Sequence, residues 1–218
     1  MESNNNLENQ EEFKIRGGWW YAFTKRIFDF FSSLILILLI SWFLLIIFII
    51  NLFATKGHPF FNDKRIGKKG KKIKVFKFRT MYYDAESNID KYLTPEQKEI
   101  WLRERKIDND PRITKFGRFL RKTSIDELPQ LFNILFGTLS VVGPRPITQK
   151  ELSNFTEAQL NIILKAKPGL TGYWQTNGRS DASFGKRVEL ESYYSRHRGF
   201  QMDFKIFLKT FGVLFRGL

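Results

Sequence analysis

An uninterrupted apolar segment constrains this chain more than any other feature. From Phe30 to Thr55, 26 residues carry no charge, and about eighteen mostly apolar residues in a row already indicate insertion into a membrane. The segment begins too far from the N-terminus, and runs too long, for a cleavable signal peptide. Beside this element, a chain of 218 residues is most simply one compact domain.

Positive charge is concentrated directly after the apolar segment. The chain has a net charge of +14, and residues Lys56 to Arg79 include ten Lys or Arg and a single acid, Asp63. Such a block beside a membrane is typical of a patch on anionic lipid, at about 1 kcal/mol per basic residue. Nucleic acid is the competing anion, but the block has no repeated aromatic platforms and no recognisable DNA-binding module, so no nucleic-acid partner is predicted. The absence of cysteine excludes disulfides and thiolate metal sites.

An adjacent acid pair, Asp126-Glu127, stands in these basic surroundings. Cations that could bind an anionic substrate surround it in the sequence: Arg112, Lys115, Arg118, Arg121, Lys122 and Arg145. Two carboxylates fit there if they attack a phosphate held by the cations, or hold a metal against it. The competing interpretation is a helix start, because Ser124 to Glu127 matches a capping box and Pro129 suits a first turn. Taken by itself, this short stretch favours the helix start.

Hydrophobic patterning predicts an α+β fold that is mainly helical, with one small β-hairpin. The hairpin is expected from Phe60–Arg65 and Ile73–Thr80, which flank a glycine-bounded turn at residues 67–70. Helices are predicted at 95–106, around 116–121, from the acid pair to about Phe136, at Glu157–Ala166 and at Phe184–Ser195. The stretch Phe204 to Phe215 suits a basic amphipathic helix lying in a membrane interface and a core-facing helix equally well.

Several longer motifs occur in a fixed order along the chain. The acid pair lies within Asp110–Asn133, which Gly137–Pro146 follows; Lys25–Asp29, Lys77–Met81 and Lys167–Ser180 complete the set. Together they resemble the bacterial sugar transferase family over roughly residues 22–216. The resemblance implies a small monotopic phosphoglycosyl transferase that moves sugar-1-phosphate from a UDP-sugar to polyprenol (undecaprenyl) phosphate, releasing UMP and starting a surface polysaccharide or other glycan.

The resemblance also implies roles for single residues. Asp126 is expected to be the nucleophile that forms a sugar-phosphoryl aspartate, and Glu127, with Asp126, to hold Mg²⁺. The residues expected to bind phosphate or nucleotide are Lys77, Arg79, Thr80, Arg121, Arg145, Gln175 and Arg179, with Arg112 a weaker choice. Trp174 suits a stacking face against the nucleotide, although core packing is the more common role of such a residue. The motifs depart from the family pattern at Asp63, where Gln is usual, and at Thr138.

Topology and location follow from the resemblance rather than from the residues. The family is re-entrant, so the chain is expected to have a polar tail at 1–21, a re-entrant membrane helix at 22–55, and a catalytic domain at 56–218. This domain would lie on the cytoplasmic face of the bacterial cytoplasmic membrane, and a homodimer is left open. The proline that usually breaks the family's helix is replaced by Trp42, although Ser41 can bend a helix by bonding back to a carbonyl one turn earlier. The residues alone favour a plain span.

A second class of function remains open on the sequence. The chain could be a membrane-tethered anion-binding protein, or a scaffold of a polysaccharide assembly complex, with no catalysis. The acid pair discriminates between these classes, because pure anion binding has no use for two carboxylates. The identity of the sugar is not specified by any motif.

Overall fold

The computed structural model describes residues 18–104, 107–178 and 183–215. These residues are mainly helical with short strands, as predicted. They form two compact units. Unit 1 comprises the described residues within 1–29, 66–71 and 139–217, and unit 2 comprises residues 30–65 and 72–138. The division falls inside the first helix and inside the hairpin, and the sequence-based domain boundary between residues 55 and 56 remains a prediction.

The elements follow one another along the chain without long gaps. The α-helices are α1 (Trp19–Ala54), α2 (Ile89–Tyr92), α3 (Pro95–Glu104), α4 (Lys115–Lys122), α5 (Gln130–Leu135), α6 (Glu157–Ile163), α7 (Tyr173–Asn177), α8 (Phe184–His197) and α9 (Phe200–Phe215). The strands are β1 (Phe60–Ile66), β2 (Lys72–Phe78), β3 (Ser140–Val142), β4 (Ile147–Thr148) and β5 (Gly169–Thr171). Three short 3₁₀ segments are η1 (Lys68–Gly70), η2 (Ile125–Glu127) and η3 (Glu151–Asn154).

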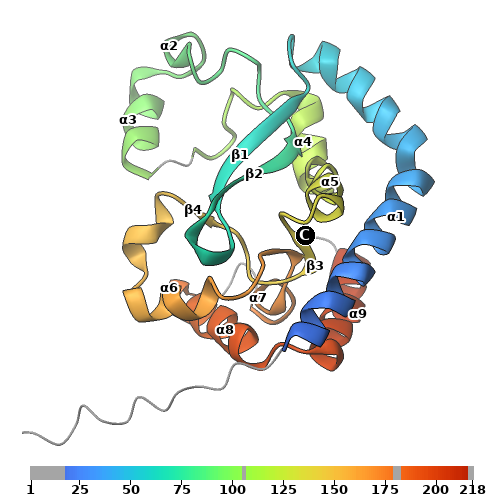
Figure 1. Ribbon diagram of the computed structural model, residues 1–218. Coiled ribbons are helices and arrows are strands. Elements are labelled where there is room, and N and C mark those ends of the chain that lie inside the picture. Colours follow the sequence, from blue (N-terminus) through green and yellow to red (C-terminus); the bar gives the residue numbers. More distant parts are fainter. Residues whose placement is uncertain (1–17, 105–106, 179–182, 216–218) are drawn as a thin grey trace, which may run out of the picture. The chain divides into compact units, whose positions relative to one another are not determined.

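Helix α1 is one continuous helix of 36 residues, long and apolar enough to cross a membrane by length and composition. Large side chains along it remain exposed, among them Leu39, Trp42 and Phe53, which fits association with a membrane. The expected interruption at Ser41 is absent, although the Ser41 hydroxyl donates to the Leu38 carbonyl at 3.0 Å, as proposed for a bend. The ribbon of α1 curves along its length (Figure 1). Re-entrant insertion remains a prediction.

Unit 2 is built around the paired strands β1 and β2, which confirm the predicted hairpin. Its core joins the C-terminal part of α1 to β2 and α4 through Ile47, Phe78 and Leu120. The buried side chain of Asn51 fixes α1 to both ends of the hairpin by donating to the carbonyls of Pro59, before β1, and Arg79, after β2. Because a buried amide must find such partners, this asparagine is explained although it lies in an apolar helix.

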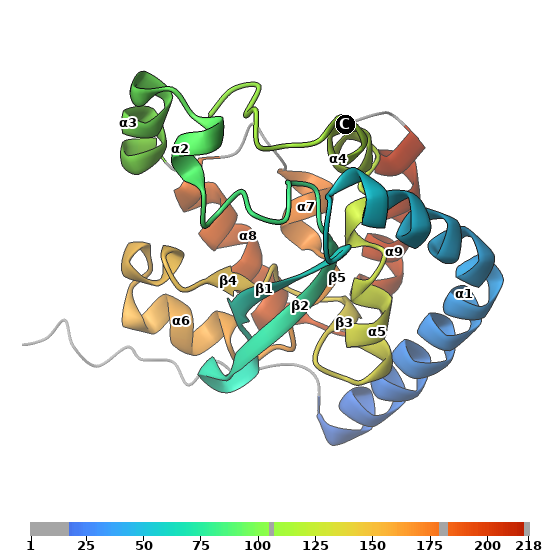
Figure 2. The same ribbon diagram turned by 90° about the horizontal axis from the view of Figure 1, so that it is seen from above.

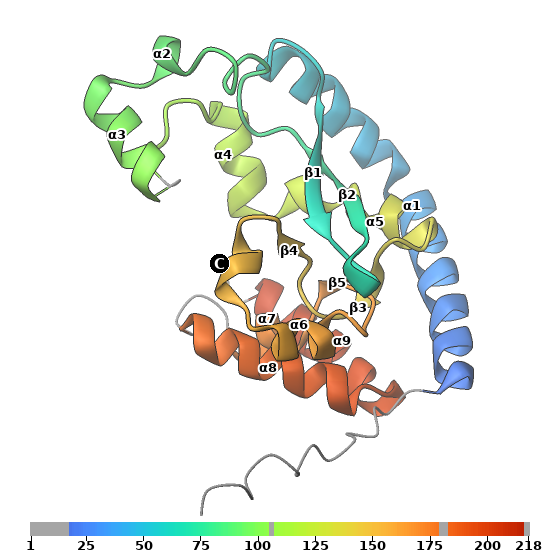
Figure 3. The same cartoon turned by 60° about the vertical axis from the view of Figure 1, so that its left-hand side comes forward.

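Unit 1 contains the parallel pair β3–β5, with Ser140 opposite Gly169 and Val142 opposite Thr171. Helices α6, α7, α8 and α9 surround this pair (Figure 3). The start of α1 belongs to the same unit, because buried Asp29 accepts from the Ser140 hydroxyl and the Val141 N–H, both at 3.0 Å. Helix α9 faces the core with Ile206, which is buried, whereas Phe204 is 62 % exposed. A position of this helix in the membrane interface remains a prediction.

The predicted helices are confirmed with small changes of length. Helix α3 begins where expected, with reciprocal bonds between Thr94 and Gln97, and it ends at Glu104, beyond which two residues lie outside the described part. Helix α6 ends three residues earlier than expected, at Ile163, and α8 ends two residues later, at His197. Of the predicted polar tail at residues 1–21, residues 1–17 lie outside the described residues. The boundary at residue 21 is wrong, because α1 already begins at Trp19.

Candidate active site

The acid pair lies in a tight turn between α4 and α5 (Figure 2). Helix α4 is capped by Thr114, whose hydroxyl accepts from the Gly117 N–H at 2.8 Å. It ends at Lys122, and Ser124 then adopts a left-handed conformation (φ 56°) that turns the chain into η2. Asp126 and Glu127 therefore stand on a single 3₁₀ turn, followed by α5 from Gln130.

The capping-box interpretation of Ser124 is wrong. The Ser124 side chain makes no capping bond, and its left-handed backbone differs from the extended conformation of a helix cap. The α-helix begins only at Gln130, after Pro129 in the capping position. The two carboxylates are thus not explained as the first turn of an α-helix, and this removes the competing interpretation of the acid pair.

Two close contacts fix this turn against the end of β2 within unit 2. A methyl group added at Gly117 would lie 2.0 Å from the carbonyl oxygen of Thr80, so only glycine allows α4 to approach the backbone after β2. Below the turn, the buried amide of Asn133 on α5 accepts from the Phe76 N–H at 2.8 Å and donates to the Lys74 carbonyl at 2.7 Å. Helix α5 is therefore bonded to β2, and α4 packs against the backbone that directly follows this strand.

The same strand brings a lysine to the acid pair. The Lys77 ammonium donates to Glu127 Oε1 at 2.7 Å, and both side chains are largely shielded from solvent. Burial raises the pKa of Asp126 to about 6, and the neighbouring Glu127 carboxylate acts in the same direction. The positive charges of Lys77 and Arg121 oppose this shift. At neutral pH, Asp126 is therefore ionised but poorly stabilised in its charged form.

Arg121 and Thr80 are the next pair that the structure brings together. The Arg121 Nε donates to the hydroxyl of buried Thr80 at 2.8 Å, which fixes one edge of the guanidinium. Of the residues predicted to bind phosphate, Lys77, Thr80 and Arg121 thus surround the acid pair in unit 2. Four side chains from β2, α4 and η2 form one charged cluster with Thr80: Lys77, Arg121, Asp126 and Glu127.

Arg79 and Arg112 belong to the same unit, but their donors are engaged elsewhere. Arg79 donates to the carbonyls of His58 and Phe60, and its guanidinium lies 5.0 Å from the centre of the Tyr83 ring. Arg112 is buried and forms a two-pronged ion pair with Asp110, with the shortest contact at 2.7 Å. In this structure both arginines hold the local backbone, and their phosphate-binding role remains a prediction.

Arg145 and Gln175 lie in unit 1, and Arg179 lies outside the described residues. The Arg145 N–H donates to Glu191 Oε1 at 3.0 Å, and its guanidinium lies 5.7 Å from the centre of the Trp174 ring. Burial raises the pKa of Glu191 to about 7. Among the described residues, the buried Gln175 Oε1 has no hydrogen-bond partner. Trp174 therefore packs against the Arg145 guanidinium. These contacts do not test its predicted stacking on a nucleotide.

The backbone next to Arg145 is hydrogen-bonded to the segment that contains Gly169 and Thr171. Gly143 N–H donates to the Thr171 carbonyl and Gly169 N–H to the Pro144 carbonyl, both at 2.9 Å. A methyl group at Gly143 would lie 2.2 Å from the carbonyl oxygen of Lys167, so this close approach of two chain segments requires glycine.

A metal would have few protein ligands here. Within the described residues, no group of three or more His, Cys, Asp or Glu side chains is arranged to hold a metal ion. The acid pair offers two carboxylates, which is the number of protein ligands that Mg²⁺ commonly takes when substrate phosphates and water supply the rest. The poorly neutralised charge of Asp126 beside Glu127 fits such a cation.

Comparison with known proteins matches nearly the whole chain to one family. Residues 20–217 match the description "Bacterial sugar transferase". The chain belongs to the bacterial sugar transferase family. This confirms the resemblance that the motifs carried, and it places the acid pair and its cationic neighbours inside the shared region.

Three relatives show how this sugar transferase compares in length. It is 40 % identical over 188 residues to the exopolysaccharide production protein ExoY of Rhizobium meliloti, covering 85 % of this chain and 83 % of ExoY. It is 40 % identical over 196 residues to the undecaprenyl-phosphate galactose phosphotransferase of Salmonella typhimurium, covering 89 % and 41 % of the two chains. It is 39 % identical over 197 residues to the UDP-galactose-lipid carrier transferase of Erwinia amylovora, covering 89 % and 41 %. The chain thus spans about two fifths of the length of the two longer relatives.

Sequence reasoning found the acid pair but missed the residues that position it. These residues, Asn133 and Gly117, were part of the recognised motif without a role. Glu191, which accepts from the Arg145 N–H in unit 1, carried no signal of its own. Their functions depend on backbone groups that are distant in the sequence, such as Phe76, which is 57 residues from Asn133.

Proposed function

We propose that this sugar transferase moves sugar-1-phosphate from a UDP-sugar to polyprenol phosphate and releases UMP, through a covalent intermediate on Asp126. The observation that carries the proposal is the charged cluster of unit 2, in which an ionised, poorly stabilised carboxylate stands beside Lys77 and Arg121. The names of relatives that act as undecaprenyl-phosphate phosphotransferases support the same reaction class.

Asp126 is the better nucleophile of the two acids. The Glu127 carboxylate is already engaged by the Lys77 ammonium at 2.7 Å, which reduces its reactivity. Charged Asp126 is destabilised by burial and by Glu127, so forming a covalent bond to phosphorus removes an unfavourable charge. An acyl phosphate formed in this way stays reactive enough to pass the group on.

The reaction has two balanced displacements at one phosphorus. First, an Asp126 carboxylate oxygen attacks the β-phosphorus of the UDP-sugar, and the bond from this phosphorus to the oxygen of UMP breaks. A phosphate oxygen of polyprenol phosphate then attacks the same phosphorus, and the aspartyl oxygen leaves as carboxylate. The bond between the sugar and its phosphate stays intact in both steps.

Cationic groups offset the charge that collects during these steps. Lys77 and Arg121 are placed to lie beside the phosphoryl group and the departing UMP. Asp126 and Glu127 would hold Mg²⁺, which when bound neutralises charge on the diphosphate. Arg145, Gln175 and Arg179 remain proposed nucleotide contacts, and the reaction is proposed for the cytoplasmic face of the membrane.

A UMP-release assay over a panel of UDP-sugars, with polyprenol phosphate as acceptor, tests the activity and identifies the sugar. The two-step mechanism also predicts that labelled UMP exchanges into the UDP-sugar when no acceptor is present, because the first displacement is reversible. The Asp126→Asn variant should lose both signals. Active enzyme without acceptor-free exchange would exclude the covalent intermediate, and absence of release with every UDP-sugar would favour the non-catalytic scaffold.

A further inference from the structure

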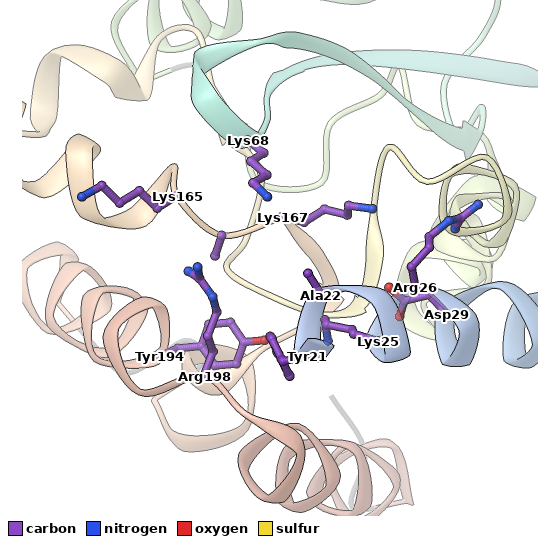
Figure 4. Close-up of a pocket in the computed structure, with 11 residues that line it drawn as sticks. Tyr21, Ala22, Lys25, Arg26, Asp29, Lys68, Lys165, Lys167, Tyr194 and Arg198 are labelled. Atoms are coloured by element: carbon purple, nitrogen blue, oxygen red, sulfur yellow. The ribbon is translucent and has the colours of Figure 1, made fainter. Parts of the chain in front are cut away.

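Unit 1 contains a pocket whose lining is rich in cations (Figure 4), here called the basic pocket. It is formed by the first turns of α1, the hairpin turn at Lys68, the segment before β5, and the C-terminal part of α8 with the residue that follows it. Its empty space amounts to about 540 Å³, including the part open to solvent. Six cations line it: Lys25, Arg26, Lys68, Lys165, Lys167 and Arg198.

The carboxylates in and beside the basic pocket already have hydrogen-bond or ion-pair partners. Asp29, the acid in the lining, is buried and accepts from the Ser140 hydroxyl and the Val141 N–H. Asp203 forms an ion pair with Lys25 at 2.5 Å. Within the described part of the chain, Lys68, Lys165 and Lys167 form no ion pair. The pocket therefore holds an excess of positive charge.

The cations of the basic pocket also repel one another. Burial lowers the pKa of Lys68, and the nearby Arg198 guanidinium lowers it further. Burial likewise lowers the pKa of Lys167, where the charges of Arg26, Lys68 and Lys25 act against that of Asp29. A bound anion would relieve both the repulsion and the loss of hydration.

Two of the donors are directed so that they can share one anion. In Figure 4, Lys68 extends from the hairpin turn and Arg198 from the end of α8 toward the same space. Lys165, Lys167 and Arg26 extend away from this space. An ammonium group and a guanidinium that face one another in this way can together bind the oxygens of one phosphate group.

Aromatic side chains beside the pocket indicate where that phosphate comes from. Trp19, Trp20 and Phe23 precede Lys25 on the same helix and are more than half exposed. On α9 of the same unit, Phe200 and Phe204 are exposed as well, and Phe200 contacts the Tyr21 ring of the pocket wall. Exposed tryptophan and phenylalanine beside basic groups are typical of a membrane interface, where basic pockets receive lipid head groups.

We propose that the basic pocket binds the phosphate group of an anionic membrane phospholipid. None of its lining residues belongs to the charged cluster around Asp126, so the proposal does not depend on the proposed function. Lys68 and Arg198 hold the phosphate, the positive charge of Lys167 adds to the attraction, and the exposed aromatic residues of α1 and α9 lie against the acyl chains.

Lipid retention by the full chain tests this site directly. The chain is released from micelles that contain equal amounts of phosphatidylglycerol and phosphatidylcholine, and its bound lipids are counted by native mass spectrometry. We expect one phosphatidylglycerol to be retained in preference to phosphatidylcholine. The double variant Lys68→Gln/Arg198→Gln should reduce that retention at least about tenfold. The charge-conserving Lys68→Arg/Arg198→Lys should restore it.

A matched control distinguishes lipid binding in the basic pocket from general electrostatic attraction to the positively charged surface. Lys69→Gln/Lys150→Gln removes the same charge from two exposed positions outside the pocket and should leave retention within about twofold of the parent chain. An equal loss in both double variants, or no preference for phosphatidylglycerol, would overturn the proposal. Displacement by millimolar inorganic phosphate would assign the pocket to a soluble anion instead. Displacement by polyprenol phosphate at lower concentration than phosphatidylglycerol would assign it to the acceptor. Either result would also overturn the proposal.

Discussion

At the scale of single residues, the site depends on a carboxylate that the fold does not stabilise. Asp126 has no ammonium or guanidinium hydrogen-bonded to it among the described contacts, whereas Glu127 has Lys77 at 2.7 Å. The fold thus neutralises one acid and leaves its neighbour in a half-buried, repulsive position. Such a division between two adjacent acids suits a nucleophile with a supporting ligand, because perturbed groups of this kind cluster at reactive sites.

Substituting Asp126→Asn should stabilise the protein while it abolishes transfer. The pKa of Asp126 is raised from 3.8 to about 6 in the folded protein, so the folded state binds this proton more tightly than the unfolded state does. Ionised Asp126 therefore lowers the free energy of unfolding by its full amount above about pH 6. This destabilisation disappears as the pH falls toward 4. With allowance for partial exposure, we expect the substitution to raise the free energy of unfolding by about 1–2 kcal/mol at pH 7.

Denaturant unfolding in detergent micelles, with a chelator present, measures this difference. The gain of the variant over the parent should shrink steadily between pH 7 and pH 4. A variant that is less stable than the parent at pH 7, or a gain that does not change with pH, would contradict the assigned electrostatics of Asp126.

Lys77 should matter far more than a lysine on the same strand. Its ammonium holds Glu127 and lowers the pKa of Asp126, so Lys77→Gln removes charge stabilisation at the reacting phosphate. We expect kcat/KM for UMP release to fall by about 100-fold. Lys74→Gln is the matched control, since Lys74 is exposed on β2, and it should retain activity within about threefold. Equal losses in the two variants would show that only the general positive charge of the hairpin matters.

At the scale of elements, the close approach of α4 to the end of β2 sets the position of the acid pair. Gly117→Ala would place a methyl carbon 2.0 Å from the Thr80 carbonyl oxygen. The helix must then move away, at a cost of about 1–3 kcal/mol in the free energy of unfolding. Transfer should fall as well, because Arg121 on α4 would lose its bond to Thr80.

Gly185→Ala provides the comparison for this substitution. Gly185 lies in the first turn of α8, and a methyl group there would have no neighbour closer than 4.0 Å. Alanine favours a helix over glycine, so the control should be neutral or slightly stabilising. Parallel thermal unfolding of the two variants measures the contrast, and a Gly117→Ala protein as stable and active as its control would refute this account of α4.

Helices and strands could be predicted from the sequence where residues close together in the chain determine them. The hairpin, the capped helix at Pro95 and the amphipathic helices each follow from residues within one or two turns. The turn at Ser124 did not follow, because its left-handed backbone is imposed by packing of α4 and α5 against β2. The recognised motifs named Lys77, Thr80 and Arg121 with the acid pair, but their pairing with specific partners requires contacts across 41 and 50 residues.

At the scale of the whole molecule, connectivity bears on how the chain meets the membrane. The start of α1 is bonded to unit 1 through Asp29 and Lys25, and its end is bonded to unit 2 through Asn51. The two units are joined directly at residues 138 and 139. Within the described residues, α1 is the one helix long and apolar enough to cross a membrane. A span by α1 would therefore place the two units on opposite sides with no second span to connect them.

Both ends of α1 should accordingly face the same side of the membrane. We predict that cysteines introduced singly at Gly18, before α1, and at exposed Lys64, in β1, react with an impermeant thiol reagent from the same side of sealed vesicles. The chain has no cysteine of its own, and a side chain at Gly18 would meet no atom within 4 Å, so labelling reports the introduced positions alone. Each variant is also labelled after permeabilisation, which gives its total reactivity. Protection of one position and not the other in sealed vesicles would establish a plain span, and the bonds of Asp29 or Asn51 would then have to break in the membrane-bound protein.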